Sequence, residues 1–93
     1  MTEDERDGMI VNELRAMAIV GEDVPSLLRR IQDMVGQKDC KLLSVIYFRK
    51  AFNVGIGSIS VLPGWHGFGG ELSDARVNTE VLPILEDYRN RGG

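Results

Sequence analysis

Residues 23–36 constrain the fold more than any other stretch of the chain, because their apolar side chains recur at helical spacing between a helix-start and a helix-stop signal. The apolar positions follow the period of one face of an α-helix. Asp23 is a suitable N-cap residue, and Pro25 lies in the first turn, where a missing N–H is tolerated. Gly36 follows as a helix-stop residue. The stripe enclosed by these signals consists of Val24, Leu27, Leu28, Ile31, Met34 and Val35.

The N-terminal part predicts another helix, with a weak beginning. From Ile10 onward, apolar residues fall at i, i+4, i+7 and i+8, which again marks one helix face. Thr2 and Glu5 have the spacing of a capping box, but Gly8 weakens a helix that starts so early. We therefore expect residues 1–7 to be a frayed acidic N-terminus.

The C-terminal part predicts a last helix after a segment rich in glycine. Ser73 or Asp74 is positioned to cap this helix, whose apolar stripe runs to Tyr88. Pro83 falls inside the stripe and predicts a kink or a break near Leu82.

The sequence KLLSVIYFRKAF (41–52) decides the fold class, and its pattern fits two structures. A β-branched and aromatic run of this kind suits a buried strand or a buried helix. Its length, and the possible cap at Asp39 and stop at Asn53, favour a central helix. We therefore predict an all-α domain of four to five short helices, with an α+β fold as the alternative if 41–48 is a strand.

The composition indicates one small globular domain that covers residues 1–93, and it favours a location inside the cell. The 93 residues have an ordinary apolar content and a formal charge of −3. The single cysteine, Cys40, excludes an internal disulfide and fits a reducing compartment. No apolar run approaches the roughly 18 residues that a membrane span needs, and the acidic N-terminus is unlike a secretory signal. These features predict a cytoplasmic location without membrane association.

Catalytic, metal and cofactor sites find little support in the sequence. One cysteine and one histidine cannot supply the four ligands of a typical zinc site. The glycines at 64–70 do not have the spacing of a phosphate-binding loop, and we expect them to permit positive φ angles instead. A small enzyme centred on His66 is a remaining alternative, but no spacing dictates a nucleophile beside it. We predict no enzyme activity, no cofactor and no metal.

A nucleic-acid-binding regulator is another alternative, and it would use the basic segment 29–50. Residues 24–54 have the outline of a helix-turn-helix. The second helix is, however, the most apolar segment of the chain, and a helix buried in the core cannot also contact bases. The acidic segments on both sides would also repel the phosphate backbone.

The remaining hypothesis is a non-catalytic protein–protein interaction module that acts through the connector 63–72. Tryptophan is enriched in binding hot spots, although a lone tryptophan in a small domain also serves to dock a loop onto the core. We expect Trp65 to anchor the connector while His66 and Phe68 point outward, with acidic residues steering a basic partner. The predicted partner-binding residues are Trp65, His66, Phe68, Glu71 and Asp74.

In size, acidity and helical pattern, the chain is similar to bacterial immunity proteins, which neutralise a basic nuclease toxin by occluding it. The similarity is one of composition and is carried by no motif. It implies a small acidic inhibitor that forms a tight complex without turnover. An apolar stripe left exposed by such short helices would also permit a homodimer.

Overall fold

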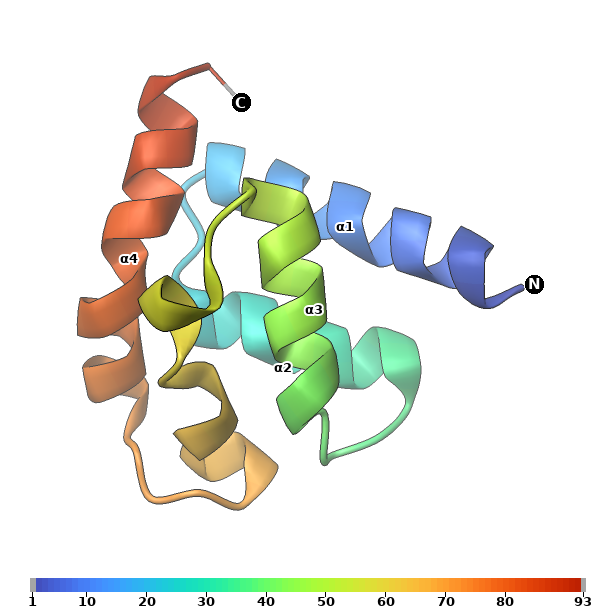
Figure 1. Ribbon diagram of the computed structural model, residues 1–93, viewed down its shortest axis with the longest axis vertical. Helices are drawn as coiled ribbons and strands as arrows, with labels where there is room; N and C mark the ends of the chain where they lie inside the picture. Colours follow the sequence, from blue (N-terminus) through green and yellow to red (C-terminus); the bar gives the residue numbers. More distant parts are fainter. Residues whose placement is uncertain (1, 93) are drawn as a thin grey trace.

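The computed structural model describes residues 2–92. They form four α-helices and three short 3₁₀ turns joined by loops, and no strand forms within this range (Figure 1). The fold is therefore all-α, as predicted. The helices are α1 (Glu3–Ile19), α2 (Val24–Val35), α3 (Lys41–Phe52) and α4 (Asp74–Asn90), and the 3₁₀ turns η1 (Ile56–Ile59), η2 (Leu62–Gly64) and η3 (His66–Phe68) lie between α3 and α4.

The end signals of α2 act as the sequence predicts. The Asp23 side chain accepts a hydrogen bond of 3.0 Å from the Ser26 N–H, and Gly36 ends the helix with a φ of 80°. Segment 41–52 is the helix α3 rather than a strand, and Asn53 ends it in the left-handed conformation. Asp39 is not its N-cap residue, because that position belongs to Cys40, whose side chain makes no capping hydrogen bond.

The predicted start of the first helix was wrong. α1 begins at Glu3, so residues 3–7 are helical rather than frayed. Thr2 Oγ1 accepts a hydrogen bond from the Glu5 N–H at 3.2 Å, and the three acidic residues of the first turn complement the helix dipole. Together these contributions offset the cost of about 1 kcal/mol that Gly8 imposes inside a helix.

α4 continues through Pro83, where the sequence predicted a kink or a break, and no break occurs (Figure 1). Pro83 is exposed, and so is Thr79, the residue whose carbonyl loses its usual N–H partner. Val77, Val81 and Leu85 are all fully buried on the opposite face. Their burial holds the helix together on both sides of the proline.

The core is centred on α3, which contacts α1, α4 and the 3₁₀ turns. Three large aromatic side chains of α3 are fully or almost fully buried, and two of them form edge-to-face contacts. Phe52 packs against Phe48 at 5.4 Å between ring centroids and against Tyr88 of α4 at 5.2 Å. α2 packs mainly against α4, which brings residues of α2 next to the connector that precedes α4.

Candidate functional site

The connector 63–72 is a closed loop built around a buried tryptophan. The Leu72 N–H donates to the Gly64 carbonyl, and the His66 N–H donates to the Leu72 carbonyl, both at 2.8 Å. The Gly70 N–H donates to the Trp65 carbonyl at 3.1 Å. The Trp65 side chain is only 1% exposed. Trp65 is therefore the core anchor of the connector, as the sequence predicted.

Close packing within the connector accounts for most of its glycines. A Cβ atom on Gly67 would overlap the Trp65 ring, and one on Gly70 would overlap the Gly64 carbonyl. Only Gly69, with a φ of 92°, has the positive φ that the sequence analysis expected for the whole cluster. The glycines thus serve close packing more than backbone freedom.

Asp74, the first residue of α4, accepts hydrogen bonds from three side chains. Its Oδ1 atom accepts from the Trp65 indole N–H at 2.6 Å and lies 2.7 Å from His66 Nε2. Its Oδ2 atom accepts from Arg29 Nη2 of α2 at 2.6 Å, and the Arg29 guanidinium lies over the indole ring, 5.4 Å from its centroid. We call these four residues the Asp74 cluster.

The cluster fixes the protonation of its carboxylate. The hydrogen bond from Trp65, followed by that from Arg29, lowers the pKa of Asp74 from 3.8 to about 2. The carboxylate is therefore ionised at neutral pH and can only accept hydrogen bonds. It follows that the Nε2–H group of His66 is the donor in its hydrogen bond to Asp74.

The structure brings three of the five predicted site residues together, leaves Glu71 exposed and buries the fifth, Phe68, in the core. Trp65, His66 and Asp74 are brought together, and Glu71 is exposed beside them. The expectation that Phe68 points outward was wrong, because Phe68 is 3% exposed and packs edge-on against Trp65 at 5.0 Å. The η3 turn folds it back into the core, so the connector offers no exposed aromatic anchor.

Two further residues of the connector's surroundings were missed by sequence reasoning. Arg29 and Gln32 lie on α2, outside its apolar stripe. The Gln32 amide donates to the Gly67 carbonyl at 2.7 Å and to the Lys38 carbonyl at 2.8 Å. Only the packing of α2 against α4 brings these side chains to the connector, and no local sequence pattern predicts this contact.

The Asp74 cluster holds a histidine–carboxylate pair but no nucleophile hydrogen-bonded to the histidine within residues 2–92. The Ser73 hydroxyl instead accepts from the Arg76 N–H, as the cap of α4. The Cys40 thiol is buried and donates to the Gln37 carbonyl at 3.3 Å, and burial raises its pKa. Among the same residues, no three His, Cys, Asp or Glu side chains converge as metal ligands.

Carboxylates lie close to four of the six basic residues of segment 29–50. Four of its basic residues form ion pairs, although the three besides Arg29 have separations of 3.6 to 3.8 Å. Arg49 and Lys38 have no ion pair within the described part of the chain. The pairs are Arg29–Asp74, Arg30–Glu13, Lys41–Asp39 and Lys50–Asp7.

The exposed side of α3 carries apolar side chains near a hollow. Leu42 is 71% exposed, and Ile46, one turn further along the same helix face, is half-buried. Ile46 lines a hollow of about 290 Å³, and we call the lining of this hollow together with Leu42 the α3 outer face. The residues of this face are Leu42, Ile46, Arg49, Lys50, Asn53 and Val54.

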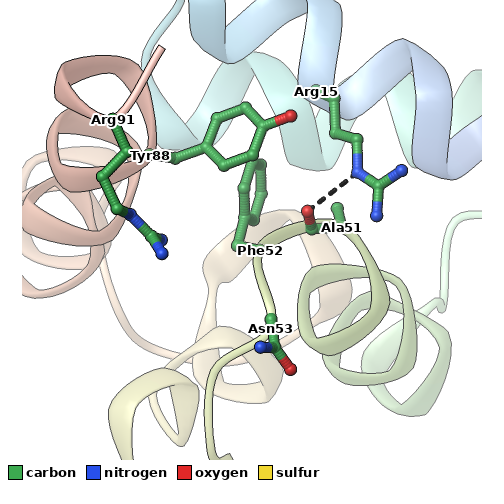
Figure 2. Close-up of a pocket in the computed structure, with 6 residues that line it drawn as sticks. All are labelled: Arg15, Ala51, Phe52, Asn53, Tyr88 and Arg91. Carbon is green, nitrogen blue, oxygen red and sulfur yellow. Dashed lines mark hydrogen bonds between the residues drawn. The ribbon is translucent and has the colours of Figure 1, made fainter. Parts of the chain in front are cut away.

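Two other hollows meet this one around the C-terminal turn of α3. One, of about 410 Å³, shares Asn53 and is flanked by Arg15 and Arg91, with the Tyr88 ring packed over Phe52 at its floor (Figure 2). Arg15 Nε donates to the Ala51 carbonyl there at 2.9 Å. The other, of about 370 Å³, shares Lys50 and reaches the α1 side chains Asp4 and Asp7.

Comparisons of the chain with protein-family models, with curated proteins and with solved structures found no match. Within residues 2–92, no helix is both long enough and apolar enough to cross a membrane.

Proposed function

We propose that this protein is a non-catalytic protein-binding module. The observation that carries the proposal is the α3 outer face, where Leu42 is 71% exposed one helical turn before Ile46, which lines a hollow together with Val54 and three polar residues. Exposed apolar side chains around a concave surface are typical of protein interaction sites. The connector takes a structural role in this proposal, because its two aromatic anchors are buried.

The chemistry of the other candidate sites supports the same class. His66 donates to a carboxylate, and no nucleophile within residues 2–92 is hydrogen-bonded to it; Cys40 is buried with a raised pKa. The ion pairs along 29–50 reduce the charge available for phosphate contacts. A nucleic-acid-binding regulator and an enzyme centred on His66 are therefore less favoured than a protein-binding module.

The experiment that tests the proposal is co-purification from native cytosol, followed by reconstitution of the purified pair. A stoichiometric complex is expected, and Leu42→Ser should weaken it. Val20→Ser is the matched control, because Val20 is 76% exposed at the opposite end of α1 from the acidic first turn. If no partner co-purifies in stoichiometric amount, the proposed function is wrong.

A narrower candidate is an inhibitor of the bacterial immunity type, which would bind a basic partner such as a nuclease toxin. The net charge of −3 and the three acidic residues in the first turn of α1 favour it. Glu71 is also exposed and unpaired within residues 2–92, whereas the Asp74 charge is engaged by three donors. This candidate predicts that Glu71→Lys weakens binding and that the partner loses its activity on complex formation.

A further inference from the structure

The α3 outer face has a charge opposite to that of the chain as a whole. Its lining contains Arg49 and Lys50 beside Ile46 and Val54, and no carboxylate contributes to it. Arg49 has no ion pair within residues 2–92, and Lys50 reaches Asp7 only at 3.8 Å while remaining 55% exposed. A hollow lined by apolar and cationic side chains therefore lies on a protein of net negative charge.

From this arrangement we propose that the α3 outer face binds an acidic amphipathic helix of a partner protein. Apolar side chains of that helix contact Leu42 and the hollow beside Ile46, and its carboxylates pair with Arg49 and Lys50. Leu42 precedes Arg49 by two helical turns on α3, and the hollow itself is lined by apolar and cationic side chains together. The inference rests on the proposed function and specifies the chemistry of the partner segment bound at this face, whereas the basic partner of the immunity-type candidate would contact the acidic first turn of α1 and Glu71.

Helix-in-groove recognition uses apolar anchors at i, i+3, i+4 and i+7 for affinity. The charges on the rim govern association rate and orientation, so binding should weaken as salt rises. The neighbouring hollow is flanked by Arg15, which donates to the Ala51 and Lys50 carbonyls, and by Arg91, which pairs with Asp87 at 3.1 Å (Figure 2). A helix that lies along α3 meets the cations Arg49 and Lys50 toward the C-terminal end of α3, and its acidic residues belong at that end.

The test uses a fluorescein-labelled amphipathic peptide longer than the roughly 12–15 residues that an isolated helix needs. It has leucines on one face and glutamates clustered toward one end, and its affinity for the full chain is measured by fluorescence anisotropy. The expected result is a Kd below about 1 mM, with amide shifts in NMR spectra concentrated on α3 and on residues 53–56. Leu42→Ser and Arg49→Glu should each weaken binding about tenfold.

Matched controls distinguish specific binding at the α3 outer face from non-specific apolar or electrostatic binding elsewhere on the surface. Val20→Ser removes a similarly exposed apolar side chain, and Lys38→Glu reverses an unpaired cation that lines a different hollow. Both should bind the peptide like the wild type, and a peptide with lysines in place of the glutamates should bind at least about tenfold more weakly. No binding up to about 1 mM, equal binding of the lysine peptide, or shifts centred on the connector would overturn the inference.

Two further outcomes distinguish this inference from the proposed function. If a stoichiometric partner is found but binds Leu42→Ser and Arg49→Glu as well as the wild type, the inference fails and the proposed function stands. If the protein sediments as a dimer that Leu42→Ser dissociates, the face is occupied by a second copy and the inference is overturned. Sedimentation of the protein alone should give a monomer.

Discussion

Removing the Asp74 carboxylate should destabilise the fold, mainly because the buried indole N–H of Trp65 then has no hydrogen-bond acceptor. In Asp74→Ala the indole N–H of Trp65, which is 1% exposed, loses its hydrogen-bond acceptor. A buried polar group left without a partner costs about 1–3 kcal/mol. The lost contacts with Arg29 and His66 add about 0.5–1 kcal/mol at most, because these side chains are 52% and 53% exposed.

The expected loss in the free energy of unfolding is therefore about 2–3 kcal/mol. A domain of this size has a total stability of roughly 5–14 kcal/mol, so the change is large and should lower Tm by about 10–20 °C. Urea and thermal unfolding followed by far-UV circular dichroism measure it. Glu71→Ala, at an exposed neighbouring position, is the control and should stay within about 0.5 kcal/mol of the wild type.

The pH dependence of the same contact has a defined sign. Because folding lowers the pKa of Asp74 from 3.8 to about 2, its stabilisation is fully present above 3.8 and disappears as pH falls through about 2. A shift of this size corresponds to roughly 2.5 kcal/mol without screening, and the 42% exposure of the side chain reduces it to about 1 kcal/mol. Asp74→Asn should lack this acid-dependent component. The reasoning is refuted if Asp74→Ala unfolds within about 0.5 kcal/mol of the wild type at neutral pH.

Three other predictions follow from single contacts. Gly67→Ala should destabilise by about 1–3 kcal/mol in urea unfolding, because its Cβ overlaps the Trp65 ring, whereas Gly57→Ala meets open space and should change little. Native Cys40 should react with a thiol reagent far more slowly than the urea-unfolded chain, since burial both shields it and raises its pKa; equal rates would contradict this. Burial and the hydrogen bond to Asp7 raise the pKa of Tyr47 to about 12, so ultraviolet titration of native protein should show this phenol ionising later than in Asp7→Ala.

The parts of the fold set by local sequence were predictable. α2 follows from its periodic stripe between Asp23 and Gly36, and α3 follows from the length of its apolar run. The early start of α1 depended on weighing the Thr2 cap against Gly8, and the capping contribution was undervalued. The continuity of α4 at Pro83 depends on burial of the opposite face, which only tertiary packing supplies.

The candidate sites were predictable only in part for the same reason. Trp65 stood out as the only tryptophan, in a segment rich in glycine, and its anchoring role followed from that setting. Its cluster also needs Arg29, which is 45 residues from Asp74 in sequence and meets it only because α2 packs against α4. Leu42 gave no sequence signal at all, because an apolar residue of a central helix is expected to be buried, and its exposure depends on which face of α3 remains uncovered.

The central claim is that the protein binds another protein without catalysis, and titration calorimetry with the co-purified partner tests it most directly. The account predicts a saturable complex of fixed stoichiometry with the wild type and with Val20→Ser, and binding about tenfold weaker with Leu42→Ser. It also predicts that neither protein of the pair is chemically changed when the complex is recovered. The claim would be contradicted by the absence of a saturable complex, or by turnover of the partner that His66→Ala abolishes.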